Sequence, residues 1–223
     1  MILDVLNKNP YTEVYFEYDS RLFSDYQHIS DSQIVTEVER TPAPAPVIKS
    51  LLESHRQKEL LDIFDSSKVI WIYRNVDDVV RSNLAKWPNF RNKIDEIANG
   101  EDNTWRSQNI AESTLSVIRT HYHNDLSHES ATALFWYMRN KLFFDQHLDQ
   151  DPRSILVRYE DLVANPNDAF EMVHKKLDLR FNPKMTKGIH QKSVSGSPLP
   201  GIAPGIHDLC TCLTQKLDAV SSS

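Results

Sequence analysis

The chain has 223 residues, of which 40% are hydrophobic, and a formal net charge of −6 at pH 7. This size and composition fit a single domain over residues 1–223 that buries roughly 70–75% of the surface its unfolded chain exposes. The acidic balance argues against a nucleic-acid partner, and no long apolar run or leader pattern predicts a membrane segment or signal peptide.

The first third of the chain predicts short strands between two helical stretches. Residues 1–10 read as the later part of a helix without a preceding N-cap, and residues 13–16 and 33–38 are weak strand candidates. The proline-rich stretch 41–46 is an extended connector. Residues 47–64 predict a helix whose inward side chains are Leu51, Leu52, Leu60, Leu61 and Phe64.

The clearest strand covers residues 68–73, where a continuous apolar run is typical of a parallel strand covered on both faces. Arg74 therefore lies at the carboxyl end of this strand, the side of an α/β sheet on which ligands bind. A guanidinium offers a planar fork of donors that suits phosphate. The strand end thus predicts an anion site.

A helix over residues 76–86 follows, because Asn75 and Asp78 form an N-cap and N3 pair and Pro88 is expected to end the helix. Ser82 lies two turns into this helix and can present its hydroxyl beside Arg74. The alternative is that Arg74 pairs with an acidic residue at the helix start, Asp77 or Asp78.

The second half predicts long helices around another strand. Helices are expected at 103–123 and 129–148, followed by a buried parallel strand at 155–159 and a helix that begins at Asn165 and Pro166. Residues 188–205 hold four of the five glycines and predict a mobile loop before a last helix at 207–219.

No metal site is predicted. His121 and His123 cannot share a helix face at a spacing of two residues, so they are a poor metal pair. Cys210 and Cys212 are too close in a predicted helix for a normal disulfide and lack the spacing of a zinc knuckle, so we interpret them as ordinary thiols.

Several segments together resemble the sulfotransferases, which use 3′-phosphoadenosine 5′-phosphosulfate (PAPS). Residues 68–82 resemble the family's 3′-phosphate-binding motif, and residues 154–166, SILVRYEDLVANP, resemble its strand and "YEDL…P" turn. Residues 49–54 and 190–194 are also family-like, and the order of segments fits from Leu3 to Leu217. The resemblance implies an α/β fold of the P-loop type, with a three-layer parallel sheet flanked by helices.

The resemblance also implies an activity and a donor site. The family transfers a sulfuryl group from PAPS to a hydroxyl or amine and releases adenosine 3′,5′-bisphosphate (PAP), without a metal. Arg74 and Ser82 would bind the 3′-phosphate, and Tyr159 would lie near the adenine or else be a core tyrosine. Lys192 and Ser193, with Ser195 and Ser197, would close donor contacts from the late loop.

The catalytic base has several candidates. Glu17 follows the first strand roughly where the Golgi-type members of the family carry their catalytic glutamate; the alternative is a surface carboxylate. His28 and His55 are weaker candidates for the same role. Lys49 is family-like, with a solvated lysine as the alternative reading.

The family's glycine-rich phosphosulfate loop, P-x-S-G-T-T, is absent, since residues 1–99 contain no glycine. A phosphate cradle needs glycine to close backbone N–H groups around the anion. We therefore expect an N-terminally incomplete domain that lacks the first strand, without measurable transfer. The alternatives are a non-catalytic PAP-binding remnant or interaction protein and a small-molecule kinase of related architecture.

The late part of the chain also lacks the Arg-Lys-Gly triplet of the cytosolic branch, which favours a bacterial-like or Golgi-like branch. The acceptor is expected to be a small molecule or glycan, and the oligomeric state stays open. The expected compartment is the cytoplasm for the sequence as written, or the Golgi lumen if a preceding segment carried a membrane anchor.

Overall fold

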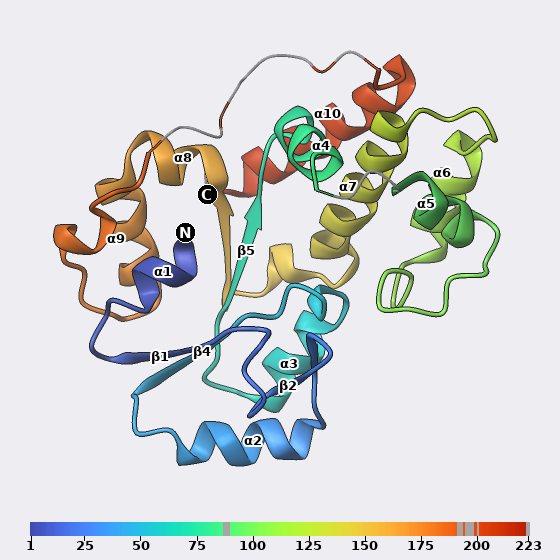
Figure 1. Cartoon of the computed structure of the whole chain (residues 1–223). Helices are drawn as coiled ribbons and strands as arrows, with labels where there is room; N and C mark the ends of the chain where they lie inside the picture. Colours follow the sequence, from blue (N-terminus) through green and yellow to red (C-terminus); the bar gives the residue numbers. More distant parts are fainter. Residues whose placement is uncertain (87–89, 191–193, 195–198, 200, 222–223) are drawn as a thin grey trace. The chain divides into compact units, whose positions relative to one another are not determined.

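The computed structural model describes residues 1–86, 90–190, 194, 199 and 201–221 (Figure 1). They form two compact units: Met1–Ser54 with Val163–His190, and His55–Leu162 with Gln191–Ser223. Each unit contains one pair of parallel strands, and helices flank the strands. The predicted α/β class is therefore confirmed, whereas the single-domain assignment over residues 1–223 stays a prediction.

The first unit is built on strands β1 (Thr12–Tyr15) and β4 (Ala45–Ile48), which pair in parallel from Thr12↔Ala45 to Tyr15↔Ile48. Helix α1 (Ile2–Leu6) precedes β1. Lys8, two residues after α1, contacts the later segment of the unit: its Nζ donates to the Met185 carbonyl at 2.7 Å. The predicted strand at 13–16 is confirmed as β1.

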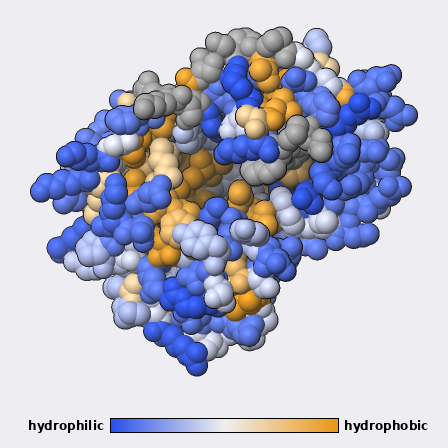
Figure 2. All heavy atoms as spheres, in the orientation of Figure 1, coloured by the Kyte–Doolittle hydropathy of each residue, from blue (hydrophilic) through white to orange (hydrophobic). Residues whose placement is uncertain are grey.

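Between these strands lie a hairpin and a helix. Strands β2 (Phe23–Ser24) and β3 (Gln27–His28) form the hairpin, and helix α2 (Asp31–Arg40) follows. The predicted strand at 33–38 is therefore wrong. Ile34 is buried while its neighbour Gln33 is exposed, and Val38 lies one turn further on the same helical face. The surface over α2, at the bottom of Figure 2, is mainly hydrophilic.

The predicted helix at 47–64 is only partly correct. Val47 and Ile48 belong to β4, and Leu51 is 62% exposed rather than inward. Helix begins only at η1 (Ser54–Arg56) and α3 (Gln57–Ile63). The β-branched pair is held as strand by parallel pairing with β1, a tertiary contact that overrides local helical periodicity.

The later part of the first unit contains helix α9 (Pro166–Lys176) and the turn η3 (Pro183–Thr186). Asn165 is the N-cap of α9 and Pro166 its first residue, as predicted, although the Asn165 side chain makes no capping hydrogen bond. Phe170 and Val173 are fully buried on one face of α9. These two residues are the contribution of α9 to the apolar core of the unit.

The second unit is built on strands β5 (Val69–Tyr73) and β6 (Ser154–Arg158), which pair in parallel and end at Tyr73↔Arg158. Helices α4 (Val76–Leu84), α7 (His128–Asp145) and α10 (Pro204–Ser221) share one hydrophobic core with Trp71 and Tyr73 (Figure 1). Ile72, on the alternate face of β5, is 37% exposed. The prediction that β5 is covered on both faces is therefore wrong at Ile72.

The remaining elements partly match their predictions. Helix α5 (Phe90–Ala98) precedes α6 (Glu112–His121), and the predicted helix at 103–123 is confirmed only over α6. The Asp102 carboxylate accepts hydrogen bonds from the backbone N–H groups of Thr104 and Ser107, which favours turns there. Turn η2 (Leu148–Gln150) follows α7.

Two further predictions concern the ends of elements. Tyr159 begins helix α8 (Tyr159–Ala164) rather than ending β6, and Gly205 lies inside α10, which starts three residues before its predicted first residue. Pro88 and part of the predicted loop at 188–205 (residues 191–193, 195–198 and 200) lie outside the described residues. Within the described part of the chain, no helix is long and apolar enough to cross a membrane.

Candidate functional site

Glu17 and Lys49 meet just beyond the carboxyl ends of β1 and β4. Parallel pairing continues past the last register pair, because the Lys49 N–H donates to the Tyr15 carbonyl at 3.0 Å. Lys49 Nζ lies 2.6 Å from Glu17 Oε2. The Glu17 side chain is 11% exposed and the Lys49 side chain 36% exposed. Lys49 is therefore the ion-pair partner of the predicted base, rather than only a solvated lysine.

The second carboxylate oxygen of Glu17, Oε1, is buried and has no hydrogen-bond partner among the described residues. Buried carboxylate oxygens normally accept at least one hydrogen bond, so such an atom needs an explanation. A substrate hydroxyl or amine that donates a hydrogen bond to Oε1 would supply one. Glu17 is thus held by one oxygen, while its other oxygen is buried with its hydrogen-bonding capacity unused.

His28 and His55, the weaker candidates for the base, have other contacts. His28 Nε2 lies 3.2 Å from Ser50 Oγ, and its ring packs against Phe23 with centroids 5.0 Å apart. The backbone N–H of His28 donates to the buried Glu53 carboxylate at 3.2 Å. His55 is buried and belongs to the second unit. The structure favours neither histidine over Glu17.

Arg74 and Tyr159, both predicted donor ligands, lie together in the second unit. They are the next residues after the last register pair of β5 and β6, Tyr73↔Arg158. The Arg74 guanidinium carbon lies 4.6 Å from the centroid of the Tyr159 ring, a cation–π contact. The Arg74 carbonyl accepts a hydrogen bond from Trp136 Nε1 at 3.0 Å, which fixes the backbone there. The Arg74 side chain is 18% exposed.

Asp78 lies between two guanidiniums at the start of α4. Its backbone N–H donates to Asn75 Oδ1 at 3.2 Å, so the predicted N-cap is present. Its carboxylate is 1% exposed, 3.8 Å from Arg74 Nη2 and 2.9 Å from Arg81 Nη1. The alternative pairing of Arg74 with Asp78 therefore exists, at a distance too long for a direct hydrogen bond. Ser82, one turn beyond Asp78, is half-buried.

The ends of β5 and β6 are further fixed by polar contacts that sequence reasoning missed. Tyr73 Oη donates to Asp218 Oδ1 of α10 at 2.7 Å, and Arg158 lies 3.7 Å from the same oxygen. Burial, and then the contact with Asp218, raise the pKa of Tyr73. The Asn75 N–H donates to Glu160 Oε1 at 3.0 Å, so Glu160 joins the two strand ends. These contacts hold Arg74 and Tyr159 in register.

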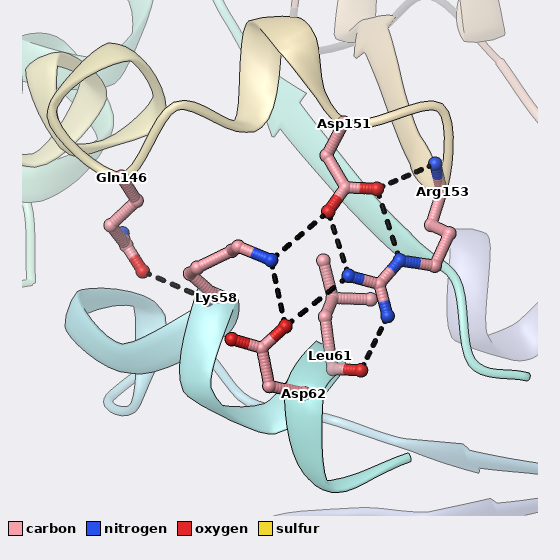
Figure 3. A network of polar contacts seen from close by, with 6 residues as sticks. All are labelled: Lys58, Leu61, Asp62, Gln146, Asp151 and Arg153. Carbon is pink, nitrogen blue, oxygen red and sulfur yellow. Dashed lines mark hydrogen bonds and ion pairs between the residues drawn. The ribbon is translucent and has the colours of Figure 1, made fainter. Parts of the chain in front are cut away.

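A second polar network lies at the amino ends of the same strands (Figure 3). Arg153 Nε and Nη2 donate to the Asp151 carboxylate at 3.0 and 2.8 Å, and Nη1 donates to the Leu61 carbonyl. Lys58 of α3 bridges Asp62 and Asp151. Because the Arg153 carbonyl accepts from the Val69 N–H, the network connects α3 to the starts of β5 and β6.

The remaining predictions are not decided by these contacts. Lys192, Ser193, Ser195 and Ser197 lie outside the described residues. Among the described residues, no group of three or more His, Cys, Asp or Glu side chains could hold a metal ion. Cys210 is buried and Cys212 exposed, and both are free. Burial raises the pKa of the Cys210 thiol to about 12.

Comparison with known proteins gives one family and one fold neighbour. The model of the sulfotransferase family matches residues 8–183. A solved structure, the sulfotransferase domain from the Curacin biosynthetic pathway, is similar over 86% of this chain and 69% of its own, with a TM-score of 0.50 and 15% identity. At that identity the likeness concerns the fold alone. No curated protein matches the chain.

Proposed function

Because the chain belongs to the sulfotransferase family, we propose that it transfers a sulfuryl group from PAPS to a hydroxyl or amine of a small-molecule or glycan acceptor. In this reaction the acceptor oxygen or nitrogen forms a bond to sulfur. The bond from sulfur to the bridging oxygen of the donor breaks, and PAP leaves with that electron pair. The acceptor proton passes to a base on the protein.

Glu17 is the proposed base, and its buried Oε1 without a partner is the observation that carries the proposal. Lys49 binds the other oxygen at 2.6 Å and so fixes the carboxylate while Oε1 stays available. General base catalysis of this kind contributes about 10²–10⁴ in rate. The imidazole of His28 contacts Ser50 Oγ through its Nε2 at 3.2 Å.

Arg74, Ser82 and Tyr159 are the proposed donor ligands. The guanidinium of Arg74 would bind the 3′-phosphate through its fork of donors, with Ser82 adding a hydroxyl. The ring of Tyr159 supports the guanidinium at 4.6 Å, which restricts its rotamers before the donor arrives. Lys192 and Ser193 are proposed to add contacts from the late segment. PAP, which carries the same 3′-phosphate, should bind to this set.

A second candidate function is PAP binding without transfer. The observation that favours it is the lack of any glycine in residues 1–99, where the family carries its phosphosulfate loop. The backbone N–H groups of such a loop stabilise the charge that develops on the transferring group, and losing one such donor costs about 10²–10³ in rate. The residues proposed to bind the 3′-phosphate do not depend on that loop.

Incubation of the chain with radiolabelled PAPS and a panel of phenols, sugars and amines decides between the two. Transfer that Glu17→Gln abolishes would support the first candidate, because Gln keeps the shape of Glu17 but takes up no proton. PAP binding without any transfer would support the second. Binding of ATP in place of PAP would contradict both and favour the small-molecule kinase, because ATP has no 3′-phosphate.

A further inference from the structure

Arg81 has no role in the proposed function, yet it lies beside the proposed donor ligands. It is on α4, where its side chain is 40% exposed and its Nη1 donates to Asp78 Oδ1 at 2.9 Å. Arg81 also comes directly before Ser82 in the sequence. An inference about Arg81 therefore rests on the proposed function and concerns the same 3′-phosphate.

The helical geometry of α4 places Arg81 on the same face as Ser82, one of the proposed ligands of the 3′-phosphate. Asp78, Arg81 and Ser82 stand at positions i, i+3 and i+4 of one helix, so their side chains share a face. Asp78 in turn is four residues after Arg74, and the Asp78 carboxylate lies 3.8 Å from Arg74 Nη2. The carboxylate thus lies between the two guanidiniums, with Ser82 adjacent.

The three charged side chains Arg74, Asp78 and Arg81 have a net positive charge, which would favour an anion. Arg74, Asp78 and Arg81 together carry a formal charge of +1, in a chain whose net charge is −6. Asp78 is 1% exposed, whereas Arg74 and Arg81 are 18% and 40% exposed. A ligand approaching from solvent therefore meets the two cations, while the buried carboxylate orients them from behind.

We propose that Arg81 is a second guanidinium ligand of the 3′-phosphate and makes the site select a 3′-phosphorylated nucleotide over one with a 3′-hydroxyl. A phosphomonoester carries a charge of about −1.5 to −2 at pH 7. Because Asp78 offsets part of the charge of Arg74, one arginine alone matches that charge poorly. Two guanidiniums supply the remaining charge and two planar sets of donors.

The test is the ratio of the affinities for PAP and for adenosine 5′-monophosphate (AMP), measured by calorimetry on the full chain. AMP lacks only the 3′-phosphate. Wild type should prefer PAP, and Arg81→Ala should lower the PAP affinity about ten-fold, as expected for a lost charged hydrogen bond, while the AMP affinity stays unchanged. Arg81→Gln, which can still donate to Asp78, should reduce the preference for PAP as Arg81→Ala does.

Arg119→Ala is the matched control. Arg119 is 44% exposed and pairs with Glu112 on α6, so its removal changes the net charge equally without touching α4. A PAP to AMP ratio that stays at the wild-type value in Arg81→Ala, or that Arg81→Gln preserves, would overturn the proposal for Arg81 and leave the donor site intact. A wild-type protein that does not prefer PAP would overturn the donor site itself, and Arg81 with it.

Discussion

Lys49 Nζ lies 2.6 Å from Glu17 Oε2, and the two residues are 32 positions apart in the sequence. Their contact follows from the parallel register of β1 and β4, which ends at Tyr15↔Ile48 and is extended by the hydrogen bond from the Lys49 N–H to Tyr15. The pair leaves Glu17 Oε1 buried and without a hydrogen-bond partner among the described residues. This arrangement places a fixed carboxylate beside a cation at the end of two strands.

The Glu17–Lys49 pair should be measurable as a coupling energy. In a double-mutant cycle of Glu17→Gln and Lys49→Met, we expect a coupling of about 0.5–1 kcal/mol, at the low end for contacting residues because Lys49 is 36% exposed and solvent screens the pair. Urea unfolding followed by circular dichroism gives the four free energies. A coupling indistinguishable from zero would mean that the contact does not hold Glu17.

The second candidate, PAP binding without transfer, predicts that transfer from labelled PAPS stays below detection, because residues 1–99 offer no glycine-rich cradle for the transferring group. The assay is incorporation of label into phenols, sugars and amines. If transfer is nevertheless found, Glu17→Gln should lower it by about 10²–10⁴. Transfer that is unaffected by Glu17→Gln would remove Glu17 as the base.

Tyr159 should support Arg74 through its ring rather than through its hydroxyl. Tyr159→Phe keeps a ring under the guanidinium and should leave PAP affinity within about two-fold of wild type, whereas Tyr159→Leu should weaken it several-fold, as expected for about 0.5–1 kcal/mol of cation–π energy. Calorimetry with PAP separates the two variants. Equal losses in both would point to the hydroxyl, and no loss in either would contradict the supporting role.

The polar network around Asp151 should make stability depend on acid pH. Hydrogen bonds from Arg153 lower the pKa of Asp151 in the folded chain below its unfolded value of about 3.9. The stabilising contribution is therefore fully present above that value and is lost as pH falls through the folded pKa. Melting temperatures of wild type and Asp151→Asn should differ at pH 7, and the difference should be smaller at about pH 3 because part of the contribution is lost below the unfolded pKa.

Asp149→Asn is the control for this acid dependence, since Asp149 is exposed and lies two residues before Asp151. It should melt like wild type at both pH values. A gap between wild type and Asp151→Asn that is the same at pH 7 and at about pH 3 would show that the carboxylate charge contributes nothing through this network.

Elements with a strong local signal could be predicted from the sequence, whereas those fixed by distant pairing could not. Strand β5 and the Asn75 cap of α4 carry their signals within a few residues. The β4 residues Val47 and Ile48 were expected to be helical, whereas the structure pairs them with β1. Their partners in β1 lie more than thirty positions earlier, so the local sequence gives no sign of the pairing. Local periodicity does not contain that pairing.

The residues of the candidate site also differ in whether the sequence could predict them. Arg74, Ser82 and Tyr159 were found from strand ends and from family resemblance, and the structure brings Arg74 and Tyr159 into contact. The ion pair of Glu17 and Lys49 needed the strand register, which the sequence does not show. Asp78 and Arg81 stand at helical spacing, so their contact could have been inferred from the sequence.

The central claim is that Arg74 binds the 3′-phosphate of the donor, and calorimetry with PAP on wild type, Ser82→Ala and Arg74→Ala tests it most directly. We expect Arg74→Ala to weaken binding by about 2–4 kcal/mol and Ser82→Ala by about 1 kcal/mol, because the guanidinium makes charged hydrogen bonds and the hydroxyl a single neutral donor. Arg119→Ala should bind as wild type does. Unchanged PAP affinity in Arg74→Ala would contradict the account.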